Sequence, residues 1–342
     1  MEKIGIPSEV NIGIPNLGNT CFLNAFLKHL AFHSEYRDLR EYPLNRQEGE
    51  SEELFTSRIA LKNVLLEMFD YLLDPANAGT NLSPKHILQF MSLWNHIKQV
   101  EEHSANKTFG FMEVNLRASD QEDAALVLRK IYQGMEFPKL STKQTLDALS
   151  LENTEVFANL SQKTRYETLN NYMPIYLNES SSQQQVSFQD LLNEQYGQKA
   201  KVMEPALEMW LDSRESLERL PALKRTYFAE DTPGITFIVE DRIFPDENFQ
   251  FQKNHKPLKI EIEVEIPTFR KDGSYGTKIM QVRSVVVHHG GSMGGHYVTY
   301  SYEKDDNDQY FWVEHNDSTV YLQKNLSSMA SGSRIIRYEE KS

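Results

Sequence analysis

The single cysteine of this chain, Cys21, is the residue best suited to covalent chemistry. It follows the polar segment Pro15-Asn16-Leu17-Gly18-Asn19-Thr20, which predicts a turn that leads directly into the first turn of a helix. Backbone N–H groups and the positive end of the helix dipole would then surround the sulfur and stabilise a thiolate. The alternative is a small buried cysteine on an apolar helix face. The polar residues before Cys21 weigh against that alternative, and a partner for the thiol is needed to decide.

A thiol nucleophile needs a base, and His296 is the best candidate among the ten histidines. It follows the glycine-rich segment Gly290-Gly291-Ser292-Met293-Gly294-Gly295 and opens the aromatic segment Tyr297-Val298-Thr299-Tyr300. Glycines let a substrate backbone pass closely, and a strand holds the imidazole rigidly. The alternative is a tight hairpin whose histidine is incidental.

The other histidines have weaker settings. The pair His288-His289 ends a β-branched segment but has no third ligand at a spacing that would hold a metal ion. His29, His86 and His255 lie among polar residues, and we expect their side chains to be in solvent.

A polar turn near the C-terminus could orient the imidazole of His296. Asn316-Asp317-Ser318 follows the aromatic segment Tyr310-Phe311-Trp312-Val313 after two further residues. Either Asn316 or Asp317 could reach His296 from a neighbouring strand. The alternative is an Asx turn, which is compatible with that role.

Helices dominate the first part of the chain and strands the last. Apolar periodicity and capping residues predict helices over 21–32, 51–74 and 84–99, a fourth capped by Ser119 or Asp120, and a short one over 187–197. Alternating residues predict strands over 235–240, 258–266, 282–288, 297–302, 310–314 and 334–338. This order indicates an α+β fold with two lobes.

Composition excludes several classes of protein. The chain has 342 residues and a net charge of −13, which argues against nucleic-acid binding because no basic stripe supplies phosphate contacts. One cysteine excludes an internal disulfide and a cysteine-rich zinc site, and no apolar run is long enough for a membrane span. The N-terminal ten residues lack the apolar region of a secretory signal. We therefore expect an intracellular, cytoplasmic protein without a cofactor.

Two segments together resemble the ubiquitin-specific protease family. Asn16-Leu17-Gly18-Asn19-Thr20-Cys21-Phe22-Leu23-Asn24 is similar to its cysteine box. Its histidine box is matched by Val286-Val287-His288-His289-Gly290, by Gly294-Gly295-His296-Tyr297-Val298-Thr299-Tyr300, and by Trp312 with Asn316-Asp317-Ser318-Thr319-Val320. Weaker matches lie between these boxes, in the right order, at 121–124, 186–192 and 234–244. The resemblance therefore covers nearly the whole chain.

The resemblance implies a role for each of these polar residues. Cys21 would be the nucleophile, and His296 the base that deprotonates it and later protonates the leaving lysine amine. Asn316 would orient the imidazole, with Asp317 as a second polar contributor. The side-chain amide of Asn16 would stabilise the oxyanion beside the backbone N–H of Cys21.

The resemblance also implies a papain-like cysteine protease fold and one catalytic domain over 1–342. A helical thumb would occupy about 11–135, fingers or an irregular insertion about 138–230, and an antiparallel β palm with the histidine box about 231–342. Many relatives hold zinc in the fingers with two Cys-x-x-Cys pairs, but this chain has no cysteine other than Cys21. Segments 125–128 and 240–244 also depart from the family pattern, which indicates a divergent member.

The implied function is hydrolysis of the isopeptide or peptide bond after the C-terminal Gly-Gly of ubiquitin, through a thioester. Alternatives are a ubiquitin-binding module without catalysis, a deconjugase for another ubiquitin-like modifier, and a papain-like peptidase with general substrates. The partner would be ubiquitin or such a modifier, bound by a monomer; a protein delivered by a secretion system would act in a host cytoplasm. Candidates for binding the arginines of the ubiquitin tail are the acidic residues Glu113, Asp120, Glu122 and Asp123.

Overall fold

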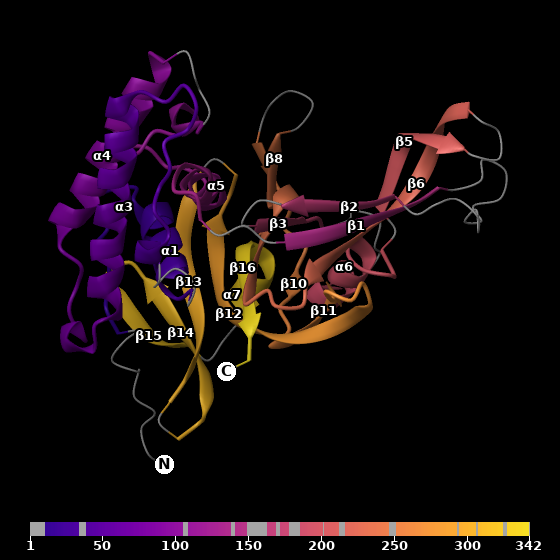
Figure 1. Ribbon diagram of the computed structural model, residues 1–342. Helices are drawn as coiled ribbons and strands as arrows, with labels where there is room; N and C mark the ends of the chain where they lie inside the picture. The colour runs from indigo at the N-terminus through magenta and orange to yellow at the C-terminus, as the bar shows by residue number, and fades with distance from the viewer. Residues whose placement is uncertain are drawn as a thin grey trace.

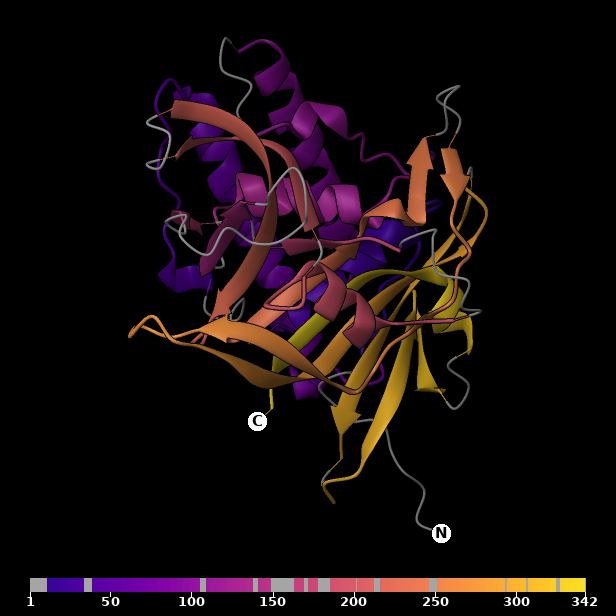
Figure 2. The ribbon, with the colours of Figure 1, turned by 90° about the vertical axis from the view of Figure 1, so that its right-hand side faces the viewer.

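The computed structural model describes residues 11–33, 39–104, 109–137, 141–148, 163–168, 172–177, 185–200, 202–211, 216–245, 251–292, 294–305, 307–323 and 327–341. Helices α3 and α4 lie on one side of the molecule, and α1 lies between them and a large sheet (Figure 1). Strands β1, β2, β5 and β6 extend to the side away from α3 and α4, and Figure 2 shows them facing the viewer.

Side chains cap the start of α3, α4, α5 and α6, whereas α1 begins without a side-chain cap at Thr20. Ser51 Oγ accepts a hydrogen bond from Leu54 N at 3.1 Å, and Ser83 precedes a proline at the first helical position. The fourth predicted helix is capped by Asp123, whose Oδ1 accepts from Ala125 N at 3.0 Å, and the prediction of Ser119 or Asp120 was wrong. The helices are α1 (Cys21–Ala31), α3 (Glu52–Leu73), α4 (Pro84–Glu102), α5 (Ala124–Gly134), α6 (Phe188–Gln195) and α7 (Ser327–Gly332), with 3-10 turns η2 (Leu39–Glu41), η3 (Pro75–Asn77), η4 (Phe111–Glu113) and η5 (Glu240–Arg242).

Strands follow helices α1 to α5 along the chain, as predicted, and α6 and α7 lie among the strands. They are β1 (Ser141–Ala148), β2 (Lys163–Thr168), β3 (Tyr172–Ile175), β4 (Val186–Ser187), β5 (Val202–Leu211), β6 (Ser216–Ala229), β7 (Gly234–Val239), β8 (Ile243–Pro245), β9 (Phe251–Lys253), β10 (Leu258–Lys259), β11 (Glu263–Phe269), β12 (Tyr275–Gly290), β13 (Gly295–Lys304), β14 (Tyr310–Asn316), β15 (Thr319–Gln323) and β16 (Ser333–Glu340). The assignment of these parts to thumb, fingers and palm stays a prediction.

Most strands join one large sheet. Its main order is β15-β14-β13-β12-β11-β6-β1-β2, and β16 pairs antiparallel with both β12 and β7. The strand predicted over 258–266 is two strands, because β10 pairs in parallel with β4 while β11 pairs with β12. Ile262, between them, is 44% exposed, so the alternation of apolar residues continues through a segment outside both strands.

Helix α1 occupies the centre of the molecule and has no exposed face. All eleven of its residues are buried, because the sheet covers one side and α3 and α5 cover the other. His29 is 0% exposed and its Nδ1 lies 2.9 Å from Ser284 Oγ on β12, so the prediction that it lies in solvent was wrong. On the opposite face of the sheet, α6 packs with Phe188 stacked against Tyr338 of β16. None of the helices in the described segments is both long and apolar enough to cross a bilayer.

Candidate active site

Cys21 is the first residue of α1 and is 3% exposed. The predicted turn precedes it: Gly18 has φ of +130°, and a Cβ there would lie 2.3 Å from Ala118 O. Asn19 N donates to Ala118 O at 2.7 Å, so this turn is fixed against the segment before α5. The cysteine therefore stands at a helix N-terminus on a rigid support, beside the N–H groups of the first helical turn.

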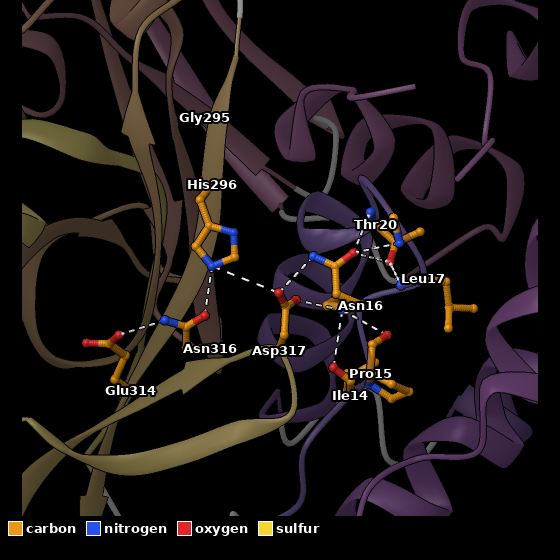
Figure 3. Close-up of polar contacts among 12 residues, drawn as sticks. Ile14, Pro15, Asn16, Leu17, Thr20, Gly295, His296, Glu314, Asn316 and Asp317 are labelled. Carbon is orange, nitrogen blue, oxygen red and sulfur yellow. Dashed lines mark hydrogen bonds and ion pairs between the residues drawn. The ribbon is translucent and has the colours of Figure 1, made fainter. Parts of the chain in front are cut away.

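His296 lies at the start of β13, and its imidazole is oriented by Asn316 at the end of β14. Its Nε2 lies 2.7 Å from Asn316 Oδ1 (Figure 3). Gly295 is required before it, because a Cβ there would lie 2.0 Å from His289 O. Since Nε2 is occupied by Asn316, Nδ1 is the ring nitrogen left for the thiol of Cys21.

The imidazolium form of His296 is stabilised by its neighbours. A hydrogen bond with the Cys21 side chain raises the pKa of His296 to about 9, against the opposing effect of burial. The hydrogen bond to Asn316 and the charges of Cys21 and Asp317 add to this rise. His296 therefore holds its proton at neutral pH, so its imidazolium can donate a proton to a leaving group.

Asn16 has an amide whose orientation is set by four contacts. Its Oδ1 accepts from Gly18 N at 3.1 Å and from Thr20 N and Oγ1 at 3.2 Å each. Its Nδ2 donates to Asp317 Oδ2 at 2.9 Å. The amide therefore presents Nδ2 beside the imidazole of His296 (Figure 3), with a second hydrogen that these contacts do not use.

Asp317 connects the turn after β14 to the cysteine segment. Its Oδ2 also lies 4.0 Å from His296 Nε2, and its Oδ1 accepts from Asn24 Nδ2 at 2.7 Å. Sequence reasoning assigned no role to Asn24, although it lies three residues after Cys21 within the cysteine box. The structure thus brings all five predicted residues together and adds Asn24 to the network.

Gln121 is a second residue whose role was not predicted. Its Nε2 donates to Gly295 O at 2.8 Å, and its Oε1 accepts from Gly295 N at 3.2 Å. This paired contact holds the backbone directly before His296 against the segment before α5. The only sequence signal was its place in the weaker match at 121–124.

The acidic residues proposed to bind the ubiquitin tail differ in the ion pairs and hydrogen bonds that they already make. Asp123 lies 2.6 Å from Arg334 Nη2, and although burial alone would raise the pKa of Asp123, Arg334 holds it below its usual value. Glu113 pairs with Lys130 at 2.7 Å. Asp120 accepts from Ser119 Oγ at 2.8 Å, and Glu122 from Asn115 N at 3.2 Å. Asp123 is thus a structural carboxylate, whereas Asp120 and Glu122 carry no ion pair that the structure describes.

The pair His288-His289 shows different surroundings for its two rings. His288 is 3% exposed, and burial lowers its pKa to about 4. The backbone of His289 on β12 lies opposite that of His296 on β13. Within the described residues, no group of three or more His, Cys, Asp or Glu side chains is arranged to hold a metal ion.

The fold is that of the ubiquitin-specific proteases, with the thiol of Cys21 on a helix and the imidazole of His296 on a facing sheet. The family model for ubiquitin carboxyl-terminal hydrolase matches residues 12–335. The chain therefore belongs to the ubiquitin carboxyl-terminal hydrolase family, and with it to the cysteine-type ubiquitin hydrolases. The resemblance found in the sequence is confirmed.

Solved structures with this fold are distant in sequence. The SAGA Ubp8/Sgf11/Sus1/Sgf73 DUB module bound to ubiquitin aldehyde matches with a TM-score of 0.65 and 12% identity, over 99% of this chain and 71% of that chain. The same module bound to monoubiquitin, with a cysteine-to-alanine Ubp8, matches with a TM-score of 0.63 and 11% identity, over 100% of this chain and 72% of that chain. No curated protein matches the sequence.

Proposed function

We propose that the protein is a deubiquitinating cysteine protease that hydrolyses the isopeptide or peptide bond after the C-terminal Gly-Gly of ubiquitin. The observation that carries this proposal is the imidazole of His296, which lies between Asn316 Oδ1 and the thiol of Cys21. Family membership supports the same substrate, and the two related structures hold ubiquitin or its aldehyde.

The proposed reaction proceeds through two tetrahedral intermediates. The Cys21 thiolate attacks the carbonyl carbon of the terminal glycine, and the oxyanion accepts hydrogen bonds from Asn16 Nδ2 and from the backbone N–H of Cys21. The intermediate collapses to a thioester as the His296 imidazolium gives its proton to the leaving lysine amine. Water then attacks the thioester while His296 takes up its proton, and the second intermediate releases the ubiquitin carboxylate and the thiolate.

The substrate proposal has further support in the surfaces beside the site. The ubiquitin tail is extended and carries arginines, so it suits a channel bordered by glycines and acidic side chains. Gly295, directly before His296, is held by Gln121, and Asp120 and Glu122 lie beside Gln121 in the same segment. We propose that the enzyme acts as a monomer in the cytoplasm, or in a host cytoplasm if it is delivered there.

Cleavage assays test this proposal directly. The purified protein should release aminocoumarin from ubiquitin-aminocoumarin and split lysine-linked diubiquitin, and Cys21→Ala and His296→Gln should each remove this activity. His255→Gln is the matched control, because His255 is an exposed histidine outside the site. Binding of ubiquitin without turnover would support a binding module instead. Cleavage of unfolded protein alone, or of another modifier alone, would refute the substrate assignment.

A further inference from the structure

A buried carboxylate lies directly behind the residue that orients the imidazole. Glu314 of β14 is 5% exposed, and its Oε1 accepts from Asn316 Nδ2 at 3.4 Å. Tyr321 of β15 donates its hydroxyl to the same oxygen, and Gln323 Nε2 donates to Oε2 at 2.6 Å. Figure 3 shows Glu314, Asn316 and His296 in one continuous chain of contacts.

This carboxylate decides which end of the Asn316 amide faces His296. A carboxylate only accepts hydrogen bonds, so it requires Nδ2 of the amide on its own side. Oδ1 must then face His296 Nε2, where it lies 2.7 Å away. Without Glu314 the amide could rotate and present a donor to Nε2, which would remove the acceptor that orients the ring.

Glu314 also supplies a charge that an asparagine lacks. A neutral amide cannot stabilise an imidazolium by charge as an aspartate would. Burial lowers the pKa of His289, which lies opposite His296 on β12, and the charge of Glu314 opposes this fall. Glu314 is largely shielded from water, so its charge is screened less than that of a surface carboxylate.

We propose that Glu314 is a positioning residue that acts through Asn316, fixing its amide as an acceptor for His296 and placing a buried negative charge behind it. This inference rests on the proposed function, since it assigns a role within the same site.

Several titratable groups surround this chain of contacts and must be considered in any pH dependence. Cys21 and Asp317 face His296 directly. On β12, His289 interacts with both Glu314 and His296, and Lys253 acts on His289 in turn. Tyr321 faces Glu314 from β15, and this contact raises the pKa of Tyr321. Each of these groups is retained in the variants below.

Glu314→Gln keeps the shape of the side chain and removes its charge. We expect kcat/KM for ubiquitin-aminocoumarin to fall about five- to tenfold, mainly in kcat. The pH at which His296 loses its proton should also fall by about half to one unit. That second effect can be measured without ubiquitin, as the pH dependence of Cys21 alkylation by iodoacetamide, because the chain has one cysteine.

Glu303→Gln is the matched control for the loss of a buried glutamate. Glu303 is 6% exposed on the neighbouring strand β13, seven residues from His296, and pairs with Arg283 Nη1 at 2.7 Å. This variant should lower the melting temperature while leaving the pH dependence of alkylation unchanged. An equal pH shift in both variants would overturn the proposal, because the shift would then follow from lost stability.

A second background separates positioning from a structural role. In Asn316→Asp, two carboxylates would lie side by side, so adding Glu314→Gln should raise kcat/KM where it lowers it in the native background. Equal losses in both backgrounds would overturn the proposal. If the native protein is alkylated with the expected pH dependence but cleaves no ubiquitin substrate, the proposed function fails, and the alkylation profiles still test Glu314.

Discussion

Replacing Asp317 with asparagine removes one negative charge from the centre of the site and keeps the shape of the side chain. Asp317 Oδ2 lies 4.0 Å from His296 Nε2, a separation at which two unit charges attract by about 4 kcal/mol at an effective dielectric constant of about 20. The His296 side chain is 37% exposed, so screening by water reduces the effect to about 1–2 kcal/mol.

The same substitution also removes a hydrogen bond. Asp317 accepts from Asn16 Nδ2 and Asn24 Nδ2, whereas an amide can accept at only one end. One donor is therefore left facing another donor, at a cost of about 1 kcal/mol. The two effects together predict a loss of kcat/KM of roughly 30- to 200-fold for Asp317→Asn.

The assay is the pH profile of ubiquitin-aminocoumarin cleavage from pH 5 to pH 10. In the native protein the alkaline limb should follow the pKa of His296, near 9, and Asp317→Asn should move this limb to lower pH. Asp308→Asn is the matched control, because Asp308 is an exposed turn residue with a φ of +63°, similar to the +52° of Asp317. An Asp317→Asn enzyme with native kcat/KM and an unmoved limb would refute the reasoning.

Three further substitutions or conditions test other contacts. Burial lowers the pKa of His29 to about 3, so the free energy of unfolding should fall as the pH drops below 6.5, by about 2 kcal/mol at pH 5 from this residue. Urea unfolding at several pH values measures this, and His29→Gln should lack this part of the pH dependence. Gln121→Ala should lower kcat/KM about tenfold, and Gln121→Glu should not restore it because a carboxylate repels Gly295 O; equal activity in all three proteins would contradict this. Arg334→Met should destabilise the fold by about 3 kcal/mol by leaving Asp123 unpaired, and Asp123→Asn should recover part of that loss in thermal unfolding; independent, additive losses would be the opposite result.

The parts of the site that the sequence could predict are those that local segments determine. Asn16 to Cys21 form a turn and a helix start from their own residue types, and two of the glycines before His296, Gly290 and Gly295, are required by close backbone contacts. The contacts that could not be predicted join distant segments. Gln121 meets Gly295 across 174 residues, and only the docking of the segment before α5 against the start of β13 brings them together.

The sequence also did not predict which polar side chains are buried. The neighbours of His29 in sequence are polar or charged on one side, yet both faces of α1 are covered, so its environment depends on layers formed by residues far along the chain. The strand predicted over 258–266 was wrong for a similar reason. Alternation of residues reports which side is apolar, but the choice of partner strand divides this segment between β4 and β12.

The central claim is that Cys21 is a nucleophile directed at the C-terminus of ubiquitin, and covalent labelling tests it most directly. Ubiquitin with a C-terminal thiol-reactive electrophile should add one ubiquitin mass to the native protein, since the chain has one cysteine, and peptide mapping should place the bond on Cys21. Labelling should be lost in Cys21→Ala and strongly slowed in His296→Gln. If the folded native protein stays unlabelled by ubiquitin while small electrophiles alkylate Cys21, the claim is contradicted.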